Sequence, residues 1–139
     1  MTRLDRFEVI PIGTIHSPYQ TPEDAPRQGR FSDAESVIEI YEPYVPGLRD
    51  VEHEKHLVVL YWLDRADRTA LAAIPPHTGI EHGVFATRSP HRPNPIGLSV
   101  ADLVLRDHNR LVVRGLDALD RTPVVDIKCY SPGIDCIPE

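Results

Sequence analysis

"LSVADLVLRDHNRLVVRGL", residues 98–116, predicts a β-hairpin more clearly than any other part of this chain. Apolar residues recur on both sides of the dipeptide His108–Asn109. Asn109 tolerates the left-handed backbone conformation that a tight turn requires, so we expect the turn to be made there. Two antiparallel strands joined by a short turn follow from this pattern.

Strand signals continue outward from the hairpin in both directions. The fourteen prolines of the chain disfavour long helices. Only residues 64–74 are compatible with a helix, which would begin at Asp64 as its N-cap and end at Pro75. Seven or so short strands separated by turns predict a mainly β chain, either a barrel or a sandwich, in one domain over residues 1–139. Besides the hairpin, the expected strands cover 7–17, 36–44, 56–63 (fully buried) and 122–130, and 83–87 leads into a loop.

Composition and charge exclude several function classes. The net charge of −6 argues against nonspecific nucleic-acid binding, but it leaves room for an RNA enzyme with a local basic patch. The apolar runs are too short to span a bilayer, and charges near the N-terminus do not fit a signal peptide, so we expect a cytoplasmic protein with no membrane partner. The spacing of Cys129 and Cys136 fits no zinc motif and indicates free thiols.

The loop that precedes the hairpin, residues 88–95, combines two arginines, one histidine, one asparagine and three prolines. The prolines fix φ and keep their preceding residues out of the helical region, so the loop loses little entropy when it binds a ligand. Arg88 and Arg92 are fork-shaped donors for carboxylate or phosphate, and Asn94 suits an adenine edge or an amide. A solvated surface turn is the alternative. We favour a binding loop because the cluster lies between apolar strands.

Other constellations point less clearly to a function. His53 and His56 are spaced so that an extended backbone directs their rings to opposite faces, so we expect no metal site. No serine or glycine motif of a hydrolase, phosphate loop or Rossmann site occurs. Asp126 and Lys128 share one face of a predicted strand, either as a surface ion pair or as a carboxylate available for proton transfer at the mouth of a barrel.

Four blocks together resemble a known family. They are "PIGTIHSPY" (11–19), "APRQG" (25–29), "GVFATRSPHRPNPIGLS" (83–99) and "LD…TPVVDIK" (116–128). They are similar to the motifs of the TrmO (YaeB) family of S-adenosylmethionine-dependent tRNA methyltransferases. The resemblance implies an antiparallel β-barrel with at most one or two short helices. It also implies methylation of N6 of N6-threonylcarbamoyladenosine beside the anticodon of tRNA, by a homodimer that binds the cofactor near the subunit interface.

The resemblance also implies site residues. The cofactor-binding set would be Pro26, Arg27, Gln28, His56, Arg88, Leu98, Gly115, Leu116 and Asp117. Substrate binding would involve Arg92, Asn94 and Lys128, and the catalytic proton acceptor would be Asp126. Arg121 replaces the family's usual glycine, and Cys129 replaces its usual proline. The competing hypotheses are a non-catalytic barrel that binds a small anionic or nucleotide metabolite, and a histidine-metal enzyme.

Overall fold

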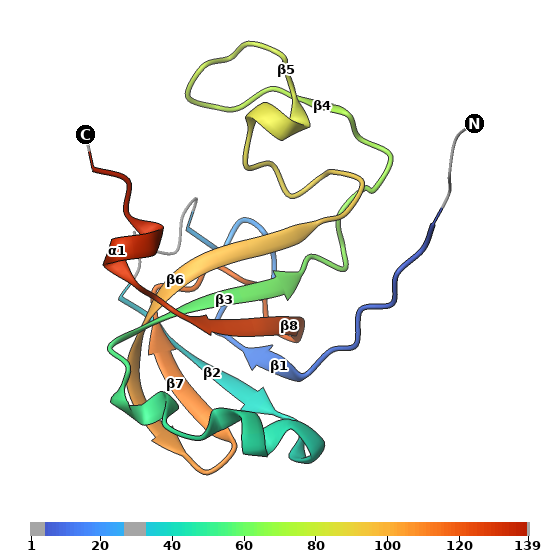
Figure 1. Ribbon diagram of the computed structural model, residues 1–139. Coiled ribbons are helices and arrows are strands. Elements are labelled where there is room, and N and C mark those ends of the chain that lie inside the picture. Colours follow the sequence, from blue (N-terminus) through green and yellow to red (C-terminus); the bar gives the residue numbers. More distant parts are fainter. Residues whose placement is uncertain (1–4, 27–32, 139) are drawn as a thin grey trace.

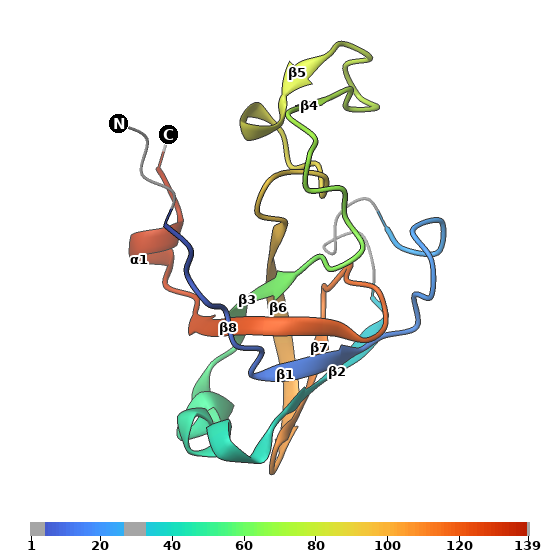
Figure 2. The ribbon, with the colours of Figure 1, turned by 90° about the vertical axis from the view of Figure 1, so that its right-hand side faces the viewer.

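Six strands form a closed antiparallel barrel in the order β1-β2-β7-β6-β3-β8 (Figures 1 and 2). The computed structural model describes residues 5–26 and 33–138. The closed barrel of six antiparallel strands confirms the predicted mainly β fold and the predicted antiparallel barrel. The barrel strands are β1 (Gly13–His16), β2 (Glu35–Ile40), β3 (His56–Trp62), β6 (Ile96–Asp107), β7 (Arg110–Arg114) and β8 (Thr122–Cys129).

The predicted hairpin is present as β6 and β7, but its turn differs from the expectation. His108 has φ of 50° and takes the left-handed conformation that we had assigned to Asn109. Asn109 is used instead to attach the turn to β2. Its side-chain amide donates to the carbonyl of Ile40 at 3.0 Å, and its own carbonyl accepts from the Ile40 amide at 2.8 Å. The hydrogen bonds between Asn109 and Ile40 of β2 therefore decide the conformation of the turn, and the propensities of the turn residues alone do not predict them.

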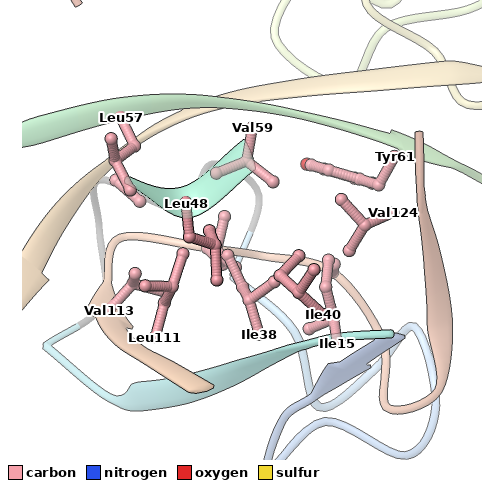
Figure 3. Packing of buried hydrophobic residues seen from close by; sticks show 13 residues of the cluster. Ile15, Ile38, Ile40, Leu48, Leu57, Val59, Tyr61, Leu111, Val113 and Val124 are labelled. Carbon is pink, nitrogen blue, oxygen red and sulfur yellow. The ribbon is translucent and has the colours of Figure 1, made fainter. Parts of the chain in front are cut away.

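Alternating side chains of the strands fill the barrel interior (Figure 3). In β3, Leu57, Val59 and Tyr61 are buried, whereas the residues between them are only partly buried, so the prediction of a fully buried strand is wrong. The alternation follows from the pleat of a strand that has the core on one side only. The core also contains Ile15, Ile38, Ile40, Leu48, Ala101, Leu111, Val113, Leu116, Ala118 and Val124.

The helix expected over 64–74 is absent: turns occupy residues 64–69, and the last part of the segment contains the short strand β4 (Ala72–Ala73). The Asp67 carboxylate accepts from the amide and the hydroxyl of Thr69, at 2.9 and 2.6 Å. The Asp67 amide donates to Nδ1 of His91 at 2.9 Å. These side-chain bonds satisfy backbone groups that a helix would otherwise use, and they attach the segment to the proline loop.

An extension outside the barrel follows these turns (Figure 1). It contains β4 (Ala72–Ala73), which pairs with β5 (His82–Gly83), and a 3₁₀ turn, η4 (Val84–Ala86). The strand signal at 83–87 is therefore only partly realised. We use "the extension" below for residues 70–86.

The remaining elements are short. The 3₁₀ segments η2 (Glu42–Leu48) and η3 (Val51–His53) follow β2, which ends at Ile40, earlier than the expected 36–44. In the described ranges α1 (Pro132–Asp135) is the one α-helix. Within those ranges no helix has the length and apolar character needed to span a membrane.

Candidate functional site

A cavity of about 760 Å³ lies at the end of the barrel where β3 finishes and β6 begins. Tyr61 and Gly97 belong to these strands, and the loops before and after them complete the wall together with residues near Pro26 and Asp117. This volume falls within the range of small-molecule sites in proteins, roughly 300–1,000 Å³. We call it the motif cavity because residues of three of the four sequence blocks line it.

The two arginines of the proline loop have different environments. Arg92 turns inward and donates to the carbonyls of Val84, Thr87 and Ser89, at 3.0, 3.2 and 2.9 Å. A guanidinium with three carbonyl partners acts as an internal brace that shapes the loop. Arg88 is exposed at the cavity wall and makes no hydrogen bond or ion pair with another described residue. Its guanidinium group is therefore available to bind a ligand.

Segment 63–68 holds the other side of the proline loop. The guanidinium of Arg68 lies 5.1 Å from the centre of the Trp62 ring and donates to the carbonyl of Pro93 at 2.8 Å. Arg68 also donates to the side-chain carbonyl of Asn94 at 3.3 Å, and the Leu63 amide donates to the carbonyl of Pro95 at 2.8 Å. The loop is thus fixed by tertiary contacts as well as by its prolines.

The loop between β7 and β8 carries Asp117 and is anchored on both sides of it. Gly115 begins the loop with φ of 96°, a conformation that favours glycine. Leu116 and Ala118 are buried in the barrel core, and the Ser17 hydroxyl donates to the carbonyl of Ala118 at 2.8 Å. The backbone around Asp117 therefore has little freedom, and its carboxylate lies at the cavity.

A buried hydrogen-bond network joins the cavity floor to this loop. The Tyr61 hydroxyl donates to Oδ1 of Asp117 at 2.7 Å and lies 2.8 Å from Oγ of Ser99. Ser99 Oγ is 3.4 Å from the same carboxylate oxygen. Burial, followed by the charge of Asp117, raises the pKa of Tyr61 well above its ordinary value. Tyr61 therefore keeps its proton at neutral pH and acts as a permanent donor.

Residues 14–136 match the model of the family described as the tRNA-methyltransferase O N-terminal domain. The chain belongs to the TrmO family. The resemblance found in the four sequence blocks is thereby confirmed.

Relatives and solved structures of TrmO proteins agree with this assignment. An S-adenosyl-L-methionine-binding protein of Archaeoglobus fulgidus is 57% identical over 127 residues, which are 91% of each chain. A putative S-adenosylmethionine-dependent methyltransferase, RcsF of Pseudomonas aeruginosa, is 39% identical over 93% of this chain and 59% of its own length. The crystal structure of TrmO from Pseudomonas aeruginosa superposes with a TM-score of 0.81 at 36% identity, covering 97% of this chain and 60% of that one. This chain thus spans about three fifths of the Pseudomonas proteins.

Six of the thirteen site residues that the TrmO resemblance implied line the motif cavity, and two more support its wall. Gly115 and Leu116 are buried directly before Asp117 and support its loop. Arg27 and Gln28 lie outside the described residues. The predicted site residues that line the cavity are Pro26, Arg88, Arg92, Asn94, Leu98 and Asp117.

Three predicted site residues lie away from the motif cavity. His56 begins β3, about 16 Å along the strand from Tyr61 at roughly 3.3 Å per residue, and its Nδ1 is 2.8 Å from Asp102. Asp126 and Lys128 line a second cavity, of about 540 Å³, near η2 and η3. Their side chains form an ion pair of 3.1 Å, so the prediction that they share one face is confirmed. The functional roles predicted for these three residues stay predictions.

Sequence reasoning missed four polar residues that shape the cavity. Arg65 lines it and donates to the carbonyl of Asp120 at 2.6 Å, and Arg68 braces the proline loop. Tyr61 is hidden in the apolar run of β3, and Ser99 in that of β6. The available signal was the hydroxyl of each residue at an inward-facing strand position, because a buried hydroxyl needs a partner.

In the described part of the chain, metal-ligating side chains do not take the arrangement that a metal ion requires. No group of three or more histidine, cysteine, aspartate or glutamate side chains in the described ranges is arranged to hold an ion. Both cysteines are free and exposed, as their spacing indicated.

Proposed function

We propose that this chain is an S-adenosylmethionine-dependent tRNA methyltransferase that methylates N6 of N6-threonylcarbamoyladenosine next to the anticodon. One observation carries the proposal. Pro26, Arg88, Leu98 and Asp117, which come from three separate sequence blocks, line a single cavity of cofactor size. Membership of the TrmO family supports methyl transfer to tRNA, and the names of the relatives support the cofactor.

The residues of the motif cavity fit the chemical groups of S-adenosylmethionine. The guanidinium group of Arg88, which has no partner among the described residues, suits the methionine carboxylate, because guanidinium and carboxylate groups bind through two parallel hydrogen bonds. The Asp117 carboxylate accepts from hydroxyl or ammonium groups. Leu98 and Ile96, both half-exposed, offer apolar surface for the adenine ring. The cavity thus provides a cation, an anion and an apolar wall for a ligand that carries their complements.

The bound cofactor supplies an electrophilic methyl group on a sulfonium sulfur. Methylation would form a bond between this carbon and N6 and break the carbon–sulfur bond, leaving S-adenosylhomocysteine, and the proton of N6 would pass to the predicted acceptor, Asp126. The contribution of the chain is to hold the two reactants in line and to exclude water. Arg65, a second basic side chain at the cavity, offers a local contact for an RNA phosphate on a protein of net charge −6.

A homodimer would unite the two sets of predicted residues. Asp126 and Lys128 lie away from the motif cavity of their own chain, so their predicted roles require that the second cavity of one copy lies beside the motif cavity of the other. Exposed apolar side chains support self-association, since contiguous apolar surface marks interaction sites. In the extension these side chains are Leu71, Ile74, Ile80 and Phe85.

Methyl transfer is tested with purified protein, labelled S-adenosylmethionine and two tRNA preparations, one with and one without the threonylcarbamoyl group. We expect label only in the modified tRNA, in a nucleoside whose mass is higher by one methyl group. Mixing the Arg88→Ala and Asp126→Asn variants tests the shared site. If each site combines residues of two chains, mixed dimers recover part of the activity that either variant alone has lost. No labelled nucleoside with either tRNA would refute the proposed reaction.

A non-catalytic S-adenosylmethionine-binding module is the second candidate. It is favoured by the name of the 57% identical Archaeoglobus protein, which refers to binding alone. The same assay separates the two functions, because a binding module retains the cofactor and transfers no methyl group.

A further inference from the structure

Tyr61 is nearly fully buried, at 3% exposure, yet it is one of the residues that line the motif cavity. A tyrosine hydroxyl can donate one hydrogen bond, and Tyr61 donates it to the Asp117 carboxylate at an oxygen–oxygen distance of 2.7 Å. The Ser99 hydroxyl lies 2.8 Å from the Tyr61 oxygen and 3.4 Å from Oδ1 of Asp117, and its one proton is donated to one of these two acceptors. With either acceptor, the network ends at Oδ1 of Asp117.

The two oxygens of Asp117 are used differently. Oδ1 lies within hydrogen-bonding distance of Tyr61 and Ser99, whereas Oδ2 accepts no hydrogen bond from a described residue. Burial of Leu116 and Ala118 fixes the backbone on either side. A carboxylate with an anchored backbone and one occupied oxygen presents its second oxygen in one defined orientation.

We propose that Tyr61 is a positioning residue for cofactor binding: its hydroxyl orients Asp117 so that Oδ2 accepts a hydrogen bond from the cofactor. Two cofactor groups have the required chemistry, the ribose hydroxyls and the ammonium of the methionine part. This inference rests on the proposed function, because it takes S-adenosylmethionine as the ligand of the motif cavity.

The test measures binding of S-adenosylhomocysteine by calorimetry to the wild type, Tyr61→Phe, Asp117→Ala and the double variant. We expect Tyr61→Phe to weaken binding about tenfold, and Asp117→Ala to weaken it more. The double variant should bind no more weakly than Asp117→Ala, because Tyr61 acts only through Asp117. Independent losses that multiply in the double variant would overturn the proposal, since a general effect on folding gives that result.

Tyr41→Phe is the matched control. It removes a tyrosine hydroxyl that bonds to the Thr14 hydroxyl at 2.6 Å, outside the motif cavity. We expect wild-type affinity. Tyr61→Phe keeps the ring in the core, so the barrel should stay folded. If thermal unfolding shows otherwise, Ser99→Ala provides the second measurement, with an expected loss of about threefold.

A second ligand, 5′-methylthioadenosine, separates the two possible donors, because it has the ribose but lacks the amino-acid part. An equal loss for both ligands in Tyr61→Phe assigns the ribose hydroxyls, and a loss for S-adenosylhomocysteine alone assigns the ammonium. Wild-type affinity of Tyr61→Phe and Ser99→Ala for both ligands overturns the positioning role but leaves the proposed function standing. No binding by the wild-type protein removes both.

Discussion

Gly97 lies directly opposite Tyr61 in the pairing of β6 with β3, and the Tyr61 ring covers it. A Cβ atom on Gly97 would lie 2.2 Å from a ring carbon of Tyr61, far inside van der Waals contact. The glycine therefore allows the ring to take the position from which its hydroxyl reaches Asp117. Tyr61 of β3 and Gly97, which belongs to the sequence block 83–99, together determine the geometry of the cavity floor.

Gly97→Ala should destabilise the protein by about 1–3 kcal/mol, because the ring must move to make room for the methyl group. Urea unfolding followed by circular dichroism measures the loss. Gly133→Ala is the control, because nothing lies within 4 Å of a Cβ at that position, and it should cost no stability. Equal unfolding midpoints for the two variants would show that the ring adapts freely.

Arg88→Ala should weaken cofactor binding by about 1.5–3 kcal/mol, the usual contribution of a hydrogen bond to a charged group. The fold should survive, because Arg88 is exposed and forms no hydrogen bond or ion pair with any residue in 5–26 or 33–138. Calorimetry with S-adenosylhomocysteine gives the affinity, and Arg110→Ala, an exposed arginine of β7 that does not line the motif cavity, is the control. Unchanged affinity of Arg88→Ala would remove Arg88 from the site.

Arg92→Ala should affect stability as well as binding, because it removes three hydrogen bonds to the carbonyls of segment 84–89. We expect the free energy of unfolding to fall by roughly 1.5–3 kcal/mol and the backbone amides of segment 84–89 to exchange faster. Arg92→Lys should rescue only part of the loss, because an ammonium group lacks the planar fork. Exchange rates equal to those of the wild type would contradict a bracing role.

Asp120 predicts a pH dependence of stability. A hydrogen bond from the Ser17 amide, at 3.0 Å, is the main cause that holds the pKa of Asp120 below its ordinary value. A carboxyl group with a lower pKa in the folded state stabilises the protein at neutral pH, and this contribution disappears as the pH falls through the folded-state pKa. Asp120→Asn should therefore lower stability at pH 7, and the difference from the wild type should shrink below about pH 4.

Urea unfolding at several pH values measures this difference. Asp107→Asn, the same chemical change in an exposed residue at the end of β6, is the control. A stability difference for Asp120→Asn that stays constant from pH 7 to about pH 3 would contradict the assignment.

The sequence predicted the strands better than the turns. Short apolar runs bounded by turn residues located β3, β6, β7 and β8 to within a few residues, because strand propensity is a local property. The helix at 64–74 is wrong, and so is the left-handed conformation predicted for Asn109, although the turn itself lies at His108–Asn109 as expected. In both places, hydrogen bonds to distant residues, His91 and Ile40, replaced the locally preferred conformation.

The sequence predicted only part of the candidate site, because contacts between distant residues also decide the role of each arginine. Arg88 and Arg92 have the same side chain and similar proline neighbours, so local sequence could not distinguish the ligand-facing arginine from the bracing one. The partners of Arg92 became known only when the backbone of the loop was folded.

The amino-acid sequence alone determined that this is a β-rich TrmO chain with a proline-stiffened arginine loop, because these properties depend on local patterns and contiguous motifs. Only the tertiary structure decided which residues meet in the cavity. Tyr61 and Asp117 are 56 positions apart in the chain, and the closed barrel brings their oxygens to 2.7 Å. His56 and Asp126 stay away from the cavity for two different reasons. His56 lies five residues along β3 from Tyr61, whereas Asp126 pairs with Leu60, whose side chain points to the opposite face of the strand from that of Tyr61.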